Sequence, residues 1–154
     1  MGRAVIRPAR SGDSTAVTAV VEAAYGAYVA RIGKPPGPML DNYGKLIDDG
    51  AISVFEETDG AVAGIVVLLP KADHLLLDNI AVAPARQGRG IGRALIAFAE
   101  SEARRHGYRE IRLYTHEKMT ENIALYKRLG FVETGRGHQA GYDRVFMAKW
   151  LERP

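Results

Sequence analysis

Three glycines at alternating positions, Gly88, Gly90 and Gly92, constrain this chain more than any other feature of its sequence. They lie between an apolar run that ends at Val82 and a helical pattern that begins near Gly90. Glycine adopts left-handed backbone conformations and lets a ligand approach the main chain closely. A turn of this kind directs several N–H groups outward, and the following helix adds the positive end of its dipole. The segment therefore predicts a binding site for a phosphate or pyrophosphate group.

Two common phosphate-binding motifs differ from this segment. A Walker A loop has Lys followed by Ser or Thr after its last glycine, whereas Arg93 and Ala94 follow Gly92 here. A Rossmann fingerprint has the spacing G-x-G-x-x-G and opens a βαβ unit, whereas these glycines are spaced G-x-G-x-G and follow a hairpin. Glu110 lies about where the ribose-binding acid of that fingerprint would fall, so a dinucleotide-binding oxidoreductase stays as a distant alternative.

Composition and charge limit the class of protein. The chain has 154 residues, of which 47% are hydrophobic and 25% charged, which is typical of one globular domain. We therefore expect a single domain over residues 1–154. No apolar run is long enough for a membrane span, and the start of the chain lacks the apolar core of a signal peptide, so we expect a cytoplasmic protein. The net charge of +3, without dense runs of basic residues, favours neither a nucleic-acid nor a membrane partner.

The chain has no cysteine and four histidines. The absence of cysteine excludes a thiolate nucleophile and Cys-ligated zinc. The histidines are not paired at i, i+4 spacing, so we expect no metal site.

The hydrophobic pattern predicts a mixed α/β domain with the order β-α-α-β-β-β-α-β-α-β-β. We expect a mostly antiparallel sheet of six to seven strands, flanked by about four helices, one of which is a crossover. Asp59-Gly60 predicts a hairpin turn, and Gly107 predicts a helix C-cap. The expected strands are 4–7, 51–57, 61–69, 74–82, 111–115, 131–134 and 142–150, with a glycine-rich loop before the last. The expected helices are 11–32, 40–48, 90–106 and 120–129.

Two segments together resemble a known family. Gln87-x-x-Gly90-x-Gly92 after the strand Ile80-Ala81-Val82 resembles motif A of the GNAT family of N-acetyltransferases. Residues 121–131, Glu-Asn-Ile-Ala-Leu-Tyr-Lys-Arg-Leu-Gly-Phe, resemble motif B of the same family. The two motifs occur in the order and spacing of the family, and with the expected element order the resemblance covers nearly the whole chain.

The resemblance implies a GNAT-like acetyltransferase domain that uses acetyl-CoA as co-substrate. The glycine-rich segment would bind the pyrophosphate through backbone amides, and the pantetheine arm would lie between two splayed strands. The residues implied in coenzyme binding are Ile80, Ala81, Val82, Gln87, Gly88, Arg89, Gly90, Ile91, Gly92, Arg93, Asn122 and Tyr126.

The resemblance also implies catalytic roles. Tyr126 stands where the family has its general acid, and a tyrosine with a pKa near 10 can protonate a leaving thiolate. A backbone N–H at a bulge near Ile80 to Val82 would stabilise the oxyanion. For the general base we expect Asp78, directly or through water, with His116 as the alternative.

The acceptor is less well defined by the sequence. We expect direct transfer to a primary amine of a small molecule, in a ternary complex. Tyrosine side chains would suit an ammonium or aromatic amine, whereas basic side chains would suit an acceptor with a carboxylate; the sequence leaves both open. A non-catalytic CoA-binding module of the same fold is the main alternative function, and a homodimer is compatible with the resemblance. The candidate acceptor contacts are Tyr25, Tyr28, Arg31, Lys34, residues 35–39, Tyr43, residues 135–142 and Arg144.

Overall fold

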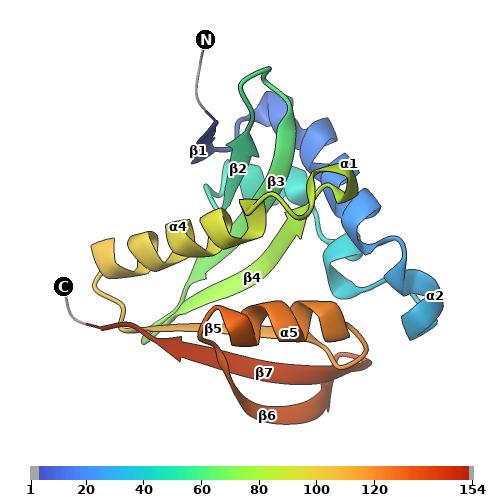
Figure 1. Ribbon diagram of the computed structural model, residues 1–154, viewed down its shortest axis with the longest axis vertical. Coiled ribbons are helices and arrows are strands. Elements are labelled where there is room, and N and C mark those ends of the chain that lie inside the picture. The colour runs from blue at the N-terminus through green and yellow to red at the C-terminus, as the bar shows by residue number, and fades with distance from the viewer. Residues whose placement is uncertain (1–3, 153–154) are drawn as a thin grey trace. The chain divides into compact units, whose positions relative to one another are not determined.

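The computed structural model describes residues 4–152, which form a mixed α/β structure with seven strands and five α-helices (Figure 1). Their order along the chain is β1-α1-α2-α3-β2-β3-β4-α4-β5-α5-β6-β7. The strands are β1 (Val5–Pro8), β2 (Ile52–Glu56), β3 (Val62–Pro70), β4 (Leu75–Val82), β5 (Glu110–His116), β6 (Val132–Gln139) and β7 (Tyr142–Trp150). The helices are α1 (Ser14–Tyr25), α2 (Tyr28–Ile32), α3 (Tyr43–Asp48), α4 (Ile91–Arg105) and α5 (Thr120–Arg128).

The strands form one sheet with the order β1-β2-β3-β4-β5-β7-β6. The pairs β1–β2, β2–β3, β5–β7 and β7–β6 are antiparallel, and β4 pairs with β5 in parallel. Parallel neighbours need a crossover connection, which α4 provides. The predicted fold class, a mostly antiparallel mixed sheet with one crossover helix, is therefore confirmed.

The chain divides into two compact units, which are described one at a time. The first unit contains the residues up to Leu68 together with Asn79–Ala99. The second unit contains Leu69–Asp78 and the residues from Glu100 onward. The chain passes from one unit to the other inside β3, inside β4 and inside α4, so these three elements belong to both.

In the first unit, α4 packs closely against β3 at Gly64. A Cβ atom at this glycine would lie 3.1 Å from side-chain carbons of Ile91 and Leu95, and 3.2 Å from the carbonyl oxygen of Ala81. Ile91 and Leu95 are buried, as their helical spacing predicts. Gly64 thus allows the first turns of α4 to lie directly on the sheet (Figure 1).

The predicted hairpin between β2 and β3 is confirmed. Gly60 has φ +87°, and the Asp59 side chain accepts a hydrogen bond from the N–H of Ala61. Gly107, which follows α4, has φ +81°, in agreement with its expected role as a C-cap.

The first predicted helix is interrupted, so the expectation of one continuous helix over residues 11–32 is wrong. The structure has a short 3₁₀ turn over 11–13, followed by α1 and α2. The N–H of Val29 bonds to the carbonyl of Gly26, three residues back, which tightens the chain between the two helices. The apolar spacing continues across this break, so periodicity alone does not reveal it.

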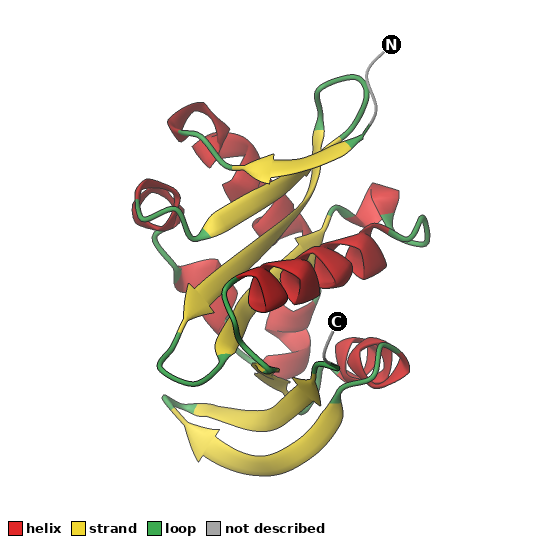
Figure 2. Cartoon of the chain, turned by 90° about the vertical axis from the view of Figure 1, so that its left-hand side faces the viewer, coloured by secondary structure: helices red, strands yellow, loops and turns green. Residues whose placement is uncertain are grey.

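In the second unit, one side of the strands is buried beneath helices. Ile111, Leu113 and Thr115 of β5 are buried and alternate with more exposed neighbours. In β7, Val145 and Met147 are buried on either side of the half-buried Phe146. The Thr115 hydroxyl lies 3.5 Å from the sulfur of Met119, the residue before α5. Helix α5 therefore covers this side of the strands, as Figure 2 shows.

The last hairpin is longer than expected. Residues 135–139, predicted as a glycine-rich loop, belong to β6 and pair with β7, so this expectation is wrong. The turn consists of Ala140 and Gly141, which have φ +54° and +84°. Every residue of β6 is exposed, so the strand has no apolar alternation by which sequence reasoning could recognise it.

Candidate active site

The glycine-rich loop of the first unit has the geometry of an anion-binding turn. Gly88 and Gly90 both have φ +81°, and a Cβ atom at either position would enter open space. The N–H of Ala94 makes the first bond of α4, to the carbonyl of Gly90. The N–H groups of Ile91 and Gly92 come before it, and such first-turn donors have no partner within the helix. They and the helix dipole are available to a phosphate.

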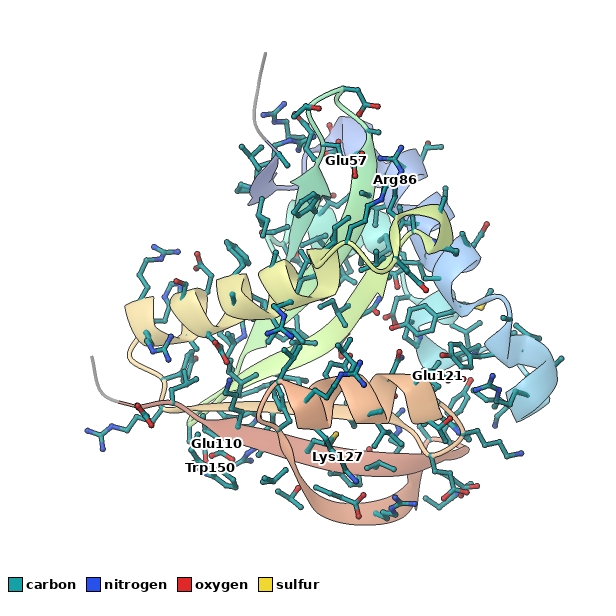
Figure 3. The ribbon with its side chains drawn as sticks, viewed as in Figure 1. Glu57, Arg86, Glu110, Glu121, Lys127 and Trp150 are labelled. Carbon is teal, nitrogen blue, oxygen red and sulfur yellow. The ribbon has the colours of Figure 1, made fainter. Side chains whose placement is uncertain are left out.

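The arginines around this loop have different environments. Arg86 forms an ion pair with Glu57, which follows β2, and Figure 3 shows the two side chains meeting. Arg89 and Arg93 are exposed. The ion pair of Arg86 thus connects the loop to the hairpin, whereas Arg89 and Arg93 are accessible to a charged ligand.

Gln87, the first residue of the predicted motif, bonds to the end of the neighbouring strand. Its Nε2 donates to the carbonyl of Val82 at 3.3 Å, although the side chain is exposed. Ile80 and Ala81 are buried and Val82 is half-buried. The structure therefore brings the predicted first-unit coenzyme residues, from Ile80 to Arg93, together around one end of β4. The expected bulge in β4 stays a prediction.

A buried polar network lies beside this part of β4. The Tyr25 hydroxyl is 2.7 Å from Oδ1 of Asn79 and 2.8 Å from the carbonyl oxygen of Ile80, so both share its single proton. Asn79 in turn donates from Nδ2 to the Tyr43 hydroxyl at 2.9 Å. Tyr25, Tyr43 and Asn79 are all buried. The network fixes the backbone at Ile80, so Tyr25 and Tyr43 have a structural role in addition to any contact with an acceptor.

In the second unit, Asp78 lies next to Tyr114, whose ring in turn contacts Arg144. The Tyr114 hydroxyl donates to Oδ1 of Asp78 at 3.2 Å, and Cζ of Arg144 lies 4.0 Å from the centre of the Tyr114 ring. Burial raises the pKa of Tyr114, against the opposing effect of Arg144, so Tyr114 stays a neutral donor. A carboxylate held in this way is placed to take a proton.

Helix α5 carries the two predicted residues of motif B. Tyr126 is buried, and its ring meets that of Phe131 edge-on at a centroid distance of 5.8 Å. Asn122 is half-buried, with its Nδ2 4.0 Å from the sulfur of Met119. Both residues belong to the second unit, so the predicted coenzyme set is divided between the two units. The roles of Tyr126 and Asn122 stay predictions.

The histidines are engaged in local contacts. His74 and His138 each pair with an aspartate, Asp73 and Asp143 respectively. His116, the alternative base, accepts a hydrogen bond from the N–H of Lys118. Within residues 4–152, no three His, Asp or Glu side chains form a group that could hold a metal ion. No helix in this described part is both long and apolar enough to cross a membrane.

Sequence reasoning missed three of these residues. Glu57 lies far from the glycine loop in sequence and gave no local signal. Asn79 did have a local sequence signal, because Asp78-Asn79 is a polar pair within an otherwise apolar strand. Tyr114 was read only as part of a strand, since its position opposite Phe146 and near Arg144 depends on the pairing of β5 with β7.

Comparison with known proteins identifies the class. The family model described as "Acetyltransferase (GNAT) family" matches residues 18–131. The chain therefore belongs to the GNAT acetyltransferase family, and the resemblance noted in the sequence is confirmed.

Individual relatives agree with this class. The chain is similar to a probable N-acetyltransferase 14 from Xenopus tropicalis, with 32% identity over 96 residues, covering 61% of this chain and 46% of the frog protein. It is also similar to the [ribosomal protein bS18]-alanine N-acetyltransferase of Escherichia coli, with 35% identity over 75 residues, covering 49% and 51% of the two chains. The chain thus spans about half the length of these curated relatives.

A solved structure has the same fold over nearly the full length. The PaiA N-acetyltransferase from Thermoplasma acidophilum, in complex with coenzyme A, superposes with a TM-score of 0.78. The superposition covers 97% of this chain and 99% of that one, at 19% sequence identity.

Proposed function

We propose that this protein transfers an acetyl group from acetyl-CoA directly to a primary amine of a small molecule. The observation that carries the proposal is the loop at Gly88 and Gly90, where two left-handed glycines precede the free N–H groups at the start of α4. This arrangement suits a pyrophosphate, and acetyl-CoA contains one. Membership of the family and the coenzyme A in the Thermoplasma neighbour support the choice of this co-substrate.

The proposed reaction needs a base for the amine, a donor that stabilises the oxyanion and an acid for the leaving thiolate. Asp78, held by Tyr114, accepts the proton of the attacking amine, directly or through water. A backbone N–H near Ile80, fixed by the Tyr25 network, stabilises the oxyanion that develops on the thioester. Tyr126 donates a proton to the departing thiolate. Since the chain has no cysteine, an acetyl-cysteine intermediate is excluded, and transfer runs within a ternary complex.

The test is a coenzyme and acceptor assay with the full chain. We expect acetyl-CoA and CoA, but not NAD or ATP, to raise the melting temperature. In a panel of primary amines, release of free CoA should depend on the amine, and mass spectrometry should detect the N-acetyl product. Stabilisation by NAD alone contradicts the proposal. Binding of CoA without acetyl transfer to any amine would favour a non-catalytic CoA-binding module instead.

A homodimer and a cytoplasmic location are further parts of the proposal. The edge strand β6 is exposed throughout, and Val132 and Trp150 remain 48% and 57% exposed. Figure 3 labels Trp150, at the end of β7. Such apolar side chains beside an open strand edge favour association with a second copy. Light scattering after size-exclusion chromatography measures the mass, and a monomer at all concentrations contradicts the dimer.

A further inference from the structure

One side of the second unit's strands carries aromatic and basic side chains. We call it the Tyr114 face; its members are Tyr114 and His116 of β5 and Tyr142, Arg144 and Phe146 of β7. The pairing of β5 with β7 places Tyr114 opposite Phe146 and His116 opposite Arg144. All five side chains are half-buried.

The described helices of this unit lie on the opposite side of the strands. Lys149 alternates with Phe146 and Ala148 along β7 and therefore points away from the Tyr114 face. Its Nζ donates to the carbonyl of Leu129 at the end of α5 and pairs with Glu100 of α4. Since α5 and the last turns of α4 contact Lys149, neither of them covers the Tyr114 face.

Arg144 differs from Arg112, the other half-buried arginine of this unit, in lacking a carboxylate partner. Arg112 and Arg136 each donate to a carboxylate, of Glu110 and Glu133 respectively. Arg144 forms no ion pair with any carboxylate in residues 4–152. Its guanidinium lies 4.0 Å from the centre of the Tyr114 ring and 5.9 Å from that of Tyr142.

The Nε atom of Arg144 is buried and has no hydrogen-bond partner within the described part of the chain. Arg144 also makes a side-chain hydrogen bond to Tyr114, but no carboxylate of the described residues neutralises this half-buried guanidinium. Its remaining donors therefore suit an anion that is not part of the chain. A guanidinium stacked on an aromatic ring is already oriented, and its planar donors match a carboxylate.

Tyr114 contacts both an acid and Arg144. The tyrosine hydroxyl bonds to Asp78, while the tyrosine ring supports the guanidinium. One end of this cluster thus offers a carboxylate to an amine, and the other offers a guanidinium to an anion. A ligand with an amine and a carboxylate a few bonds apart matches both ends.

We propose that Arg144 binds a carboxylate of the acceptor, so that the acceptor is an amino acid or a similar small amine that carries a carboxylate. This inference rests on the proposed function, since it names the substrate class of the same reaction. Arg144 is a specificity-determining residue, and Asp78 remains the acid that faces the amine.

The experiment compares matched acceptors on wild type and variants. Each of the common amino acids is assayed with acetyl-CoA beside its carboxamide and its decarboxylated amine. We expect wild type to prefer a carboxylate-bearing acceptor. Arg144→Gln should lower kcat/KM for that acceptor about 10- to 100-fold, mainly through KM, which corresponds to the loss of a charge-assisted pair. The same variant should affect the rate with the decarboxylated amine and the affinity for CoA much less, so the ratio of kcat/KM between the two acceptors should fall.

Two further variants separate binding from folding. Arg112→Gln removes the same charge two residues from Tyr114, where the guanidinium is already paired with Glu110, and should leave acceptor preference unchanged. Arg144→Lys keeps the charge without the planar donors and should give an intermediate KM. Equal losses for the carboxylate and the decarboxylated amine in Arg144→Gln, or loss of preference in Arg112→Gln, would overturn the inference.

The two proposals fail differently. If decarboxylated amines and carboxamides are acetylated as well as amino acids, the acetyltransferase proposal stands and the inference about Arg144 is wrong. If no amine is acetylated, the proposed function fails, and calorimetric titration of the amino acids into the CoA-saturated protein tests the inference separately. Binding that is lost in Arg144→Gln then supports it, and equal or absent binding in both proteins refutes it.

Discussion

The candidate ligand-binding sites in the two units of this chain are built from different parts of the protein. In the first unit, the candidate coenzyme site is built from backbone: the left-handed Gly88 and Gly90 and the opening turn of α4. In the second unit, the candidate acceptor site is built from the side chains of Asp78, Tyr114 and Arg144, each from a different strand. A backbone site suits a ligand that is the same throughout a family, whereas side chains on strands can change with the substrate.

The strongest test of the backbone site is Gly90→Val. A β-branched residue at φ +81° is strained and closes the approach to the loop, so we expect acetyl-CoA affinity to fall about 1,000-fold, as if two charge-assisted hydrogen bonds were lost. Gly60→Val, at φ +87° in the hairpin turn, is the matched control. It should lose similar stability, about 1–2 kcal/mol, but no affinity. Calorimetric titration measures both; an equal loss in the two variants would refute the loop model.

The strongest test of the side-chain chemistry is Tyr126→Phe. Removing the proton donor should lower kcat about 100-fold while the dissociation constant for CoA stays the same. The loss should shrink for thioesters with more acidic leaving thiols, because these need less protonation. Normal turnover with a good acceptor would show that Tyr126 is a packing residue against Phe131.

Tyr25→Phe tests whether the buried hydrogen-bond network of the first unit affects the rate of acetyl transfer. Loss of the hydroxyl leaves Oδ1 of Asn79 and the carbonyl of Ile80 without this donor, so we expect a cost of about 1–3 kcal/mol in unfolding free energy. We also expect kcat to fall about tenfold, because the backbone near Ile80 loses its fixed position. Tyr43→Phe removes the hydroxyl that accepts from Asn79 and keeps the bond from Tyr25 to Ile80, so this control should affect stability more than kcat.

Acid unfolding tests the Arg7–Asp13 ion pair of the first unit, which has a structural role and is not part of the candidate site. Two hydrogen bonds from Arg7 lower the pKa of Asp13 from 3.8 to about 2. A carboxylate with a lowered pKa stabilises the folded state above its ordinary pKa, and this contribution is lost as pH falls through about 2. Asp13→Asn should therefore cost about 1–2 kcal/mol at pH 6 and little at pH 2. Urea unfolding at both pH values measures this; a cost that does not depend on pH would contradict it.

The smallest effect concerns charge around the glycine loop. Glu57→Gln frees Arg86 from its ion pair, and we expect a change of only about threefold in acetyl-CoA affinity, because both side chains are only half-buried and charges near the surface are screened. Arg89→Gln, which removes an exposed arginine, should weaken affinity by a similar factor. A loss as large as that of Gly90→Val in either variant would mean that side-chain charge, and not backbone, holds the pyrophosphate.

Local chemistry was predictable from the sequence and long-range pairing was not. The hairpin at Gly60, the cap at Gly107 and the buried face of α4 each depend on neighbouring residues, and all three agree with the structure. The break at Gly26 was missed because apolar spacing continues through it. Strand β6 was missed because only its pairing with β7 defines it.

The same distinction applies to the candidate site. The glycine loop consists of a few consecutive residues, so its position could be predicted from the sequence. The stacking of Arg144 on Tyr114 depends on the register between two strands thirty residues apart, which no local pattern encodes. The sequence therefore suggested a basic contact for a carboxylate but had no means to choose Arg144 from the other candidates.

The close approach at Gly64 has a consequence for engineering. This residue has no catalytic role in the proposed mechanism, yet a single methyl group there would crowd the side chains of Ile91 and Leu95 and require them to shift. The displaced segment carries the donors that the pyrophosphate needs. Libraries designed to change coenzyme preference should therefore keep position 64 fixed. Variants found there would alter the protein by moving a helix, and their effects would not combine additively with changes in the loop.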